Sequence, residues 1–493
     1  MASPAKHGNI LVIMVDQHRA DCLGCMGNRE VQTPHIDALA AVGVRYENSF
    51  CPFPVCTPSR YSFLSGRYAF EHRGLNNRST PLPEVVMWPE LLRRAGYRTA
   101  AVGKMHFTPT YLDVGFERMC LSEQDGPGRW DDDYHRYLRD RGLVDADDLI
   151  DQRMEYREHA PESYWKSLGA KPSNLPEEHH STTWIGDRAV EELETWQGNG
   201  NLLMASFIKP HHPHDPPKAW WDRYPAASVS PLPGWMPRCP ERDLAFNGGY
   251  FPHEHFDEAA LRQATAAYYA NIAHVDHQVG RMVEKLKEKG LYEDTLILYT
   301  ADHGEYMGFH HMTLKAGIMY DPLVKVPLVI RFGADLDRGG VSEQLVSNID
   351  IGPTLLAWAG VAADAAMTGR DLYRDEAGHA VVFAEDGRPW HAMARDERWK
   401  LVRQAPGTTP LLFDLQNDPL ELHNVYEVSK HRAVVERLEA AIAAWRGEGA
   451  REGVYVDHDA PVIDQPNVPK AGDGHREAMI AYCREAMSAY GPY

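Results

Sequence analysis

Residues 51–67 read CPFPVCTPSRYSFLSGR and place a nucleophilic side chain at the predicted start of a helix. Pro58 suits the first turn of a helix, so a helix is predicted from Cys56 through Leu64. Backbone N–H groups at such a start favour an anion. Arg60 adds a planar set of donors that fits a tetrahedral oxyanion. Cys56 is therefore a candidate nucleophile in an anion site, although C-x-P alone also describes an ordinary buried cysteine.

The segments around this motif alternate apolar runs with helical patterns. Residues 9–15 form a continuous apolar, β-branched run, which is typical of a strand buried on both faces of a parallel sheet. Such patterns predict further strands at 42–48, 99–103, 202–208 and 295–301, and helices at 33–40, 88–96, 184–196, 257–289 and 348–359. This alternation predicts an α/β fold.

The sequence pattern changes after residue 375. Short strands at 380–384, 392–396, 399–403 and 411–415, followed by a helix at 430–446, predict a small antiparallel sheet with a helix packed on it. We therefore predict a catalytic domain over 1–375, an α+β subdomain over 376–447 and an extended tail over 448–493. The tail is expected to cover the catalytic domain or to reach a neighbouring subunit in a homo-oligomer. Segments 109–185 and 216–256 lack periodicity and are predicted to be substrate-selecting insertions.

Composition narrows the class of partner. The 493 residues carry a net charge of −19, with 43% hydrophobic and 25% charged residues. This acidic balance argues against nucleic acid or an anionic membrane as a partner. The apolar run at 9–15 is too short to span a bilayer and no secretory cleavage pattern accompanies it, so a cytoplasmic protein is expected. The seven scattered cysteines fit reduced thiols better than a disulfide framework.

Polar residues follow four of the predicted strands and could share one crevice, because ligands bind at the carboxyl ends of parallel strands. They are Asp16 and Gln17, Lys104 and His106, His211, and Asp302 and His303. Carboxylates buried together cost several kcal/mol each without a counter-ion, so a divalent cation is favoured. Oxygen ligands suggest Ca²⁺, whereas the histidine shifts the preference toward Mn²⁺. Each aspartate alone could equally be a helix cap.

These motifs together resemble the sulfatases. CTPSR at 56–60, followed by LSGR at 64–67, resembles the sulfatase signature. DHGE at 302–305, with Lys315 beyond it, resembles the second metal-binding motif of the sulfatase and phosphonate monoester hydrolase branch of the alkaline phosphatase superfamily. Asp16-Gln17 resembles the first metal motif, GKMH at 103–106 the lysine-histidine element, and KPH at 209–211 the substrate-contacting histidine. The resemblance runs from residue 9 to about residue 425.

This resemblance implies an alkaline-phosphatase-like fold, whose mixed and mostly parallel sheet is sandwiched by helices. It also implies that a formylglycine-generating enzyme oxidises Cys56 to formylglycine, whose hydrated aldehyde is the nucleophile. One divalent metal, Ca²⁺ or Mn²⁺, would be held by Asp16, Gln17, modified Cys56, Asp302 and His303.

The resemblance further assigns roles around the substrate, which would be a small sulfate ester. Arg60 and Lys104 would neutralise charge on the sulfate oxygens, while Lys315 and His211 would contact the sulfate and protonate the leaving oxygen. His106 would accept a proton from the second hydroxyl of the hydrate. Asn77 matches an asparagine that points into the site of such enzymes. His214 follows His211 in one loop and is a further candidate for substrate binding.

Two departures from the common sulfatase pattern bear on the substrate. Asp-Gln and Asp-His in the metal motifs are closer to choline sulfatases and phosphonate monoester hydrolases, and GKMHF at 103–107 is particularly like the choline sulfatase pattern. Phosphonate hydrolases tend to have glycine and alanine where Thr57 and Ser59 stand, which favours sulfate esters. The alternatives are a phosphonate monoester or phosphodiester hydrolase, and a non-catalytic metal-binding homologue with unmodified Cys56.

Overall fold

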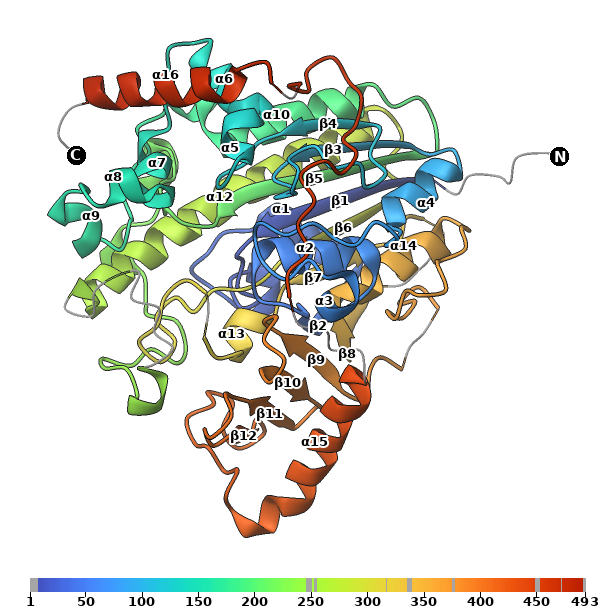
Figure 1. Cartoon of the computed structure of the whole chain (residues 1–493), viewed down its shortest axis with the longest axis vertical. Coiled ribbons are helices and arrows are strands. Elements are labelled where there is room, and N and C mark those ends of the chain that lie inside the picture. The colour runs from blue at the N-terminus through green and yellow to red at the C-terminus, as the bar shows by residue number, and fades with distance from the viewer. Residues whose placement is uncertain are drawn as a thin grey trace.

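The main sheet runs through the centre of the molecule (Figure 1). The computed structural model describes residues 8–244, 251, 255–315, 317–334, 339–374, 377–447, 453–470 and 472–490. Its strands are β1 (Asn9–Asp16), β2 (Val44–Phe50), β3 (Arg98–Gly103), β4 (Arg118–Leu121), β5 (Asn201–Pro210), β6 (Thr295–Ala301), β7 (Leu328–Arg331) and β8 (Gly340–Ser347). In the order β4-β3-β5-β1-β6-β7-β2-β8, only β7 runs antiparallel to its neighbours. The predicted mixed, mostly parallel α/β sheet is confirmed.

Helices cover both faces of this sheet, because β1 is apolar on both sides. Leu11, Ile13 and Val15 belong to one hydrophobic core, and Ile10, Val12 and Met14 belong to another. The first core includes residues of α1 (Pro34–Val42), α10 (Ser181–Glu194) and the long α12 (Glu258–Glu288). The second includes residues of α2 (Cys56–Ser65), α4 (Trp88–Arg94) and α14 (Ile351–Trp358). The helices predicted from apolar spacing are all present.

The order of the central strands brings the predicted site together. Strands β3, β5, β1 and β6 are adjacent and parallel, so their carboxyl ends lie at one edge of the sheet. This edge carries the polar residues that follow each strand. It also carries Cys56, the first residue of α2. The crossover connections of a parallel sheet thus gather residues that are far apart in sequence.

A second, antiparallel sheet lies below the main one in Figure 1. Its strands are β9 (Val382–Glu385), β10 (Ala392–Arg395), β11 (Trp399–Arg403) and β12 (Leu411–Asp414), in the order β12-β11-β10-β9. Helix α15 (Arg432–Arg446) packs on it through Val435, Leu438 and Ile442. The predicted small sheet with its helix is confirmed, and the domain boundaries at 375 and 447 stay predictions.

The segment predicted as a non-periodic insertion holds more structure than expected. It contains the edge strand β4 and the short helices α5 (Gly128–Asp131), α6 (Asp133–Arg139), α7 (Ala146–Gln152), α8 (Met154–Arg157) and α9 (Glu162–Lys166). Helices of one or two turns show no apolar period, which explains why the sequence pattern did not reveal them. Other short helices are α3 (Ala69–His72), α11 (Lys218–Trp221) and α13 (Asp321–Val324).

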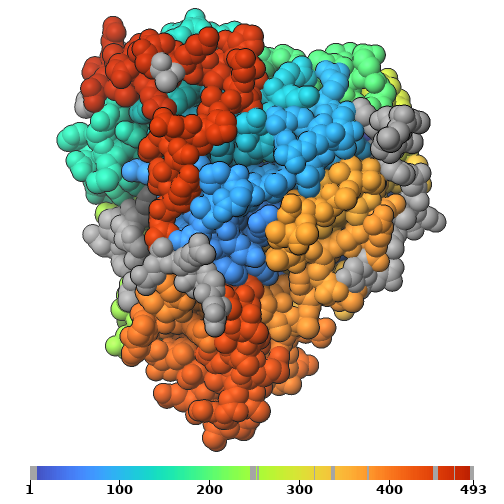
Figure 2. Space-filling view, turned by 45° about the vertical axis from the view of Figure 1, so that its right-hand side comes forward, coloured from blue at the N-terminus to red at the C-terminus, as the bar shows by residue number. Residues whose placement is uncertain are grey.

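The C-terminal tail lies on the part of the chain that forms the main sheet. Its backbone joins that domain through Thr80 N–H to Tyr455 O (3.0 Å) and Ile463 N–H to Tyr111 O (3.1 Å). Figure 2 shows the tail, in red, crossing the surface beside blue segments. The tail ends in a helix that was not predicted, α16 (His475–Tyr490). We expected a wholly extended tail because its Gly and Pro residues masked the helix.

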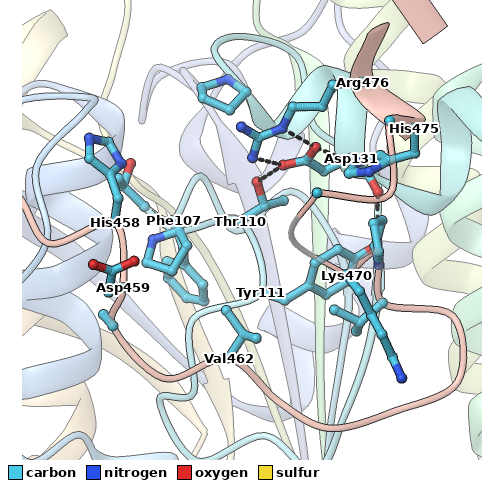
Figure 3. A pocket seen from close by; sticks show the side chains of 18 of the residues that line it. Phe107, Thr110, Tyr111, Asp131, His458, Asp459, Val462, Lys470, His475 and Arg476 are labelled. Atoms are coloured by element: carbon cyan, nitrogen blue, oxygen red, sulfur yellow. Dashed lines mark hydrogen bonds and ion pairs between the residues drawn. The ribbon is translucent and has the colours of Figure 1, made fainter. Parts of the chain in front are cut away.

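One buried carboxylate anchors the tail. Asp131 accepts hydrogen bonds from Thr110 Oγ1 (2.8 Å) and Arg476 (2.5 and 2.6 Å), and His475 Nε2 lies 2.7 Å from it (Figure 3). These residues help to line a cavity of about 750 Å³ between the tail and residues 107–111. In the part of the chain that the structure describes, no helix is long and apolar enough to cross a membrane.

His72 supports the helix that carries Cys56 and makes stability depend on pH. Its Nε2 lies 2.9 Å from Ser62 Oγ of α2, and Gly74 N–H donates to its Nδ1 (3.1 Å). Burial lowers the pKa of His72 from 6.5 to about 3. The neutral imidazole therefore contributes stability that is present above pH 6.5 and is lost as pH falls toward 3.

Between pH 6.5 and pH 5 this loss is about 2 kcal/mol. His72→Asn lacks the imidazole and should not show this loss. The difference in unfolding free energy between wild type and variant should therefore be smaller at low pH by that amount. Urea denaturation at pH 7 and pH 5 measures the gap. His423→Asn, at a 77% exposed side chain, should leave the pH dependence unchanged. Parallel pH profiles for wild type and His72→Asn would contradict the prediction.

Candidate active site

A cluster of buried ligating groups lies at the carboxyl edge of the main sheet. Ligand atoms of Asp16, Cys56, Asp302 and His303 all lie within 4.8 Å of one another, and all four residues are buried. Cys56 Sγ is 3.3 Å from His303 Nε2 and 3.6 Å from Asp16 Oδ1. The structure thus brings together four of the five residues predicted as metal ligands.

Gln17, the fifth predicted ligand, lies at the same place. Its backbone N–H donates to Asp302 Oδ1 (3.1 Å), and its side-chain Nε2 donates to Glu305 Oε2. Its buried Oε1 has no hydrogen-bond partner among the described residues. An orphaned buried oxygen is costly, and carboxylate, carboxamide and imidazole groups are ligands of divalent cations. The donor set therefore fits a divalent metal.

Arg60 lies deeper than its sequence motif predicted. Its donors reach Asp302 Oδ2 (2.9 Å), Asp16 Oδ2 (3.1 Å), Ser206 Oγ (2.9 Å) and the Lys104 carbonyl. We expected this guanidinium to face the substrate oxyanion. In the structure it holds the carboxylates of Asp16 and Asp302, and its contact with a substrate oxyanion stays a prediction.

Two lysines and a histidine lie around Cys56. Lys104 Nζ is 2.8 Å from Asp16 Oδ2, and Lys315 Nζ is 2.8 Å from Cys56 Sγ. Lys315 also lies 3.0 Å from His211 Nε2. Burial opposes ionisation of the Cys56 thiol, but Lys315, Lys104 and His303 hold its pKa well below the usual range. The site is therefore electropositive around residue 56.

The remaining predicted residues lie at or beside the same cluster. His106 is one of the groups that lower the pKa of the Cys56 thiol, and its buried Nδ1 has no hydrogen-bond partner among the described residues. Asn77 Oδ1 accepts from Thr57 N–H (3.1 Å) at the start of α2. His214 packs edge-on against Tyr268, with ring centroids 5.6 Å apart, and its buried Nδ1 likewise lacks a partner in the described chain. Contact of Asn77 and His214 with substrate stays a prediction.

The structure adds supporting residues that the sequence did not single out. Glu123 accepts from the N–H groups of Met105 and His106 (both 2.9 Å), which fixes the turn after β3. Gln124 Oε1 lies 3.4 Å from Lys104 Nζ. Glu305 belongs to the quoted DHGE motif and orients Gln17, so that motif was the available signal. No local pattern marked residues 123 and 124.

Comparison with known proteins gives the family. A family model described as Sulfatase matches residues 8–361, and one described as N-sulphoglucosamine sulphohydrolase, C-terminal, matches residues 308–448. The chain is 29% identical over 497 residues to an arylsulfatase of Clostridium perfringens, covering 91% of this chain and 96% of the relative. It is 28% identical over 478 residues to a choline-sulfatase of Rhizobium meliloti, covering 92% and 88%.

A solved structure supports the same grouping. Phosphonate monoester hydrolase of Agrobacterium radiobacter matches with a TM-score of 0.73 and 25% identity, covering 90% of this chain and 96% of that chain. The expected place in the alkaline phosphatase superfamily is confirmed. Because the Sulfatase model spans well over half of its residues, the chain belongs to the sulfatase family.

Proposed function

We propose that this sulfatase hydrolyses sulfate monoesters with a formylglycine, formed from Cys56, and one divalent metal. The observation that carries the proposal is the position of Cys56 Sγ. It lies 3.3 Å from His303, 3.6 Å from Asp16 and 2.8 Å from Lys315 Nζ. A group at this point can be bound by a cation and can also attack an anion held by the lysines. Formation of formylglycine requires a converting enzyme as a maturation partner.

Asp16, Gln17, Asp302 and His303 would hold the metal together with modified residue 56. When formylglycine and the metal are present, a hydroxyl of the hydrated aldehyde would supply the nucleophile, and Ca²⁺ or Mn²⁺ would lower the pKa of that hydroxyl. Arg60 keeps Asp16 and Asp302 oriented toward this position through its bonds to both carboxylates.

The cationic side chains would bind the sulfate group and supply the proton for the leaving oxygen. Lys104 and Lys315 neutralise charge on the sulfate oxygens, a contribution that preorganised donors make to the transition state. The His212 carbonyl can only accept a hydrogen bond, so His211 Nδ1 carries a proton (2.7 Å) and its Nε2 faces Lys315. His211 Nε2 therefore accepts from Lys315 Nζ, and Lys315 can give a proton to the leaving oxygen while His211 holds it in place. His106 accepts a proton at residue 56.

Substitution of Gln17 tests whether this residue is a metal ligand. Replacing Gln17 by leucine removes the orphaned Oε1, so metal-stripped protein should bind Mn²⁺ about 10- to 100-fold more weakly. Equilibrium dialysis followed by elemental analysis measures this change. Gln416→Leu, at an exposed position, is the control and should bind as the wild type does. Equal affinities for wild type and Gln17→Leu would remove Gln17 from the ligand set.

A phosphonate monoester or phosphodiester hydrolase is the second candidate. The solved phosphonate monoester hydrolase at 25% identity favours it, and both substrate classes present a tetrahedral anion. Thr57 and Ser59 favour sulfate, since glycine and alanine are typical of phosphonate hydrolases at these places. Ser59 Oγ donates to the Asp302 carbonyl (2.5 Å) and Thr57 Oγ1 to the His106 carbonyl (2.8 Å).

The experiment that decides is a panel of aryl and alkyl sulfates, aryl phosphonate monoesters and phosphodiesters, assayed on metal-reconstituted protein. Sulfate esters should show the highest kcat/KM. A higher kcat/KM for phosphonate monoesters would replace the proposed function by the second candidate. Turnover of neither class by protein that contains formylglycine would reject both.

A further inference from the structure

Behind His211 lies a second histidine that the proposed mechanism does not use. The rings of His211 and His212 stack with centroids 4.1 Å apart and an interplanar angle of 25°. His212 Nδ1 is 2.5 Å from Asp151 Oδ2, and Tyr164 Oη donates to Asp151 Oδ1 (2.5 Å). All four side chains are buried. They form a continuous polar chain that leads from the insertion to the active site.

His212 holds His211 through two different groups. Its ring lies against one face of the His211 ring, and its carbonyl accepts from His211 Nδ1 (2.7 Å). That carbonyl is itself fixed by Gln124 Nε2 (2.8 Å) and Gln152 Nε2 (3.3 Å). With the Nδ1 proton held in this way, Nε2 is the His211 nitrogen that faces Lys315 Nζ. Both the orientation and the tautomer of His211 therefore depend on where His212 lies.

We propose that Asp151 is a positioning residue which, by holding His212, keeps His211 oriented so that its Nε2 holds Lys315, the proton donor to the leaving alcohol. The inference rests on the proposed function, since it concerns the leaving-group step of that reaction. An acidic group that fixes the ring and tautomer of a catalytic histidine has this effect in hydrolytic triads. Here the effect passes through a stacked second imidazole and its carbonyl.

Leaving-group dependence tests the proposal. Asp151→Asn keeps the shape of the side chain but weakens its hold on His212. Only a poor leaving group needs a proton in the transition state, so kcat for an alkyl sulfate should fall about tenfold and kcat for 4-nitrophenyl sulfate less than about threefold. KM should stay unchanged for both esters. The loss should therefore grow with the pKa of the leaving alcohol.

A matched control lies on the same helix. Asp147 of α7 is also buried, but its side chain bonds Lys171 and the Asn174 N–H rather than His212. Asp147→Asn should change both esters equally. If Asp151→Asn folds poorly, Tyr164→Phe removes one hydrogen bond to Asp151 and should give a smaller loss with the same dependence. Equal losses on the two esters for both variants would overturn the proposal.

A measurement without turnover separates this inference from the proposed function. In ¹⁵N-histidine-labelled enzyme, His211, assigned with a His211→Gln variant, should show the Nδ1–H tautomer. Asp151→Asn should shift it toward a mixture of tautomers. An unchanged His211 signal in Asp151→Asn would overturn the positioning role. Failure of the wild type to hydrolyse any ester of the panel would instead reject the proposed function. The spectroscopic result would then still decide whether Asp151 positions His211.

Discussion

Replacing Cys56 by alanine is expected to lower kcat/KM for a sulfate ester by about 10⁴-fold or more, because it removes the nucleophile itself. The side chain at this position is buried and lies within 3.6 Å of both Asp16 and His303. Cys56 starts helix α2 and contacts both the predicted metal ligands and Lys315. Steady-state kinetics on folded, metal-loaded protein measures the effect.

Cys51→Ala is the matched control for this variant. Cys51 is also buried, five residues earlier, but its Sγ faces the Leu323 carbonyl (3.9 Å) rather than the site. Its loss should lower stability and leave kcat/KM within a few-fold. Peptide mapping of active wild type should find residue 56 lighter than cysteine. Fully active protein with an intact Cys56 thiol would contradict the assigned chemistry.

Replacing Lys104 by methionine is expected to lower kcat about 100-fold or more, which is the usual cost of removing one oxyanion-stabilising donor. Lys104 Nζ is only 1% exposed and lies 2.8 Å from Asp16 Oδ2. Burial opposes ionisation of Asp16, but Lys104, His211 and Lys315 hold the pKa of its carboxyl well below the usual range. The variant should therefore lose charge stabilisation of the sulfate and also leave Asp16 less well paired.

Lys400→Met separates this effect from simple loss of a buried charge. Lys400 is fully buried and bonds Asp321 (2.7 Å) and Glu421 (2.8 Å), neither of which is a predicted site residue. Breaking that pair should cost about 3 kcal/mol of stability or more and leave kcat per folded molecule unchanged. Pre-steady-state rates on both variants make the comparison. A Lys104→Met enzyme with wild-type kcat would exclude Lys104 from contact with the transition state.

Much of the fold could be predicted from local patterns. The continuous apolar run of β1 is buried on both faces, as its composition requires, and its last residue is the predicted metal ligand Asp16. Pro58 and the following apolar residues likewise predicted α2. Such predictions succeed because burial of a strand or of one helix face is recorded in neighbouring residues. Strand β8 and helix α16 were missed, because only three of the eight residues of β8 are buried and α16 follows a segment rich in glycine and proline.

The structure brings the predicted site residues together, but not all of their contacts could be predicted. Sequence motifs identified every residue of the ligand cluster, because each follows a buried strand or starts a helix. They placed Arg60 toward the substrate, whereas its donors meet Asp16 and Asp302. Gln124 and Asp151 were not singled out, because they lie in short elements without a periodic signal.

By itself, then, the sequence determined the α/β class, the polar ends of four strands and the cysteine at the start of a helix. These are properties of adjacent residues and depend on hydrophobic period and backbone geometry. Only the tertiary structure decided that Arg60 bonds the carboxylates of Asp16 and Asp302, and that His212 connects Asp151 to His211. Those contacts join residues tens to hundreds of positions apart, so they depend on the strand order of the sheet and on how the insertion packs against its edge.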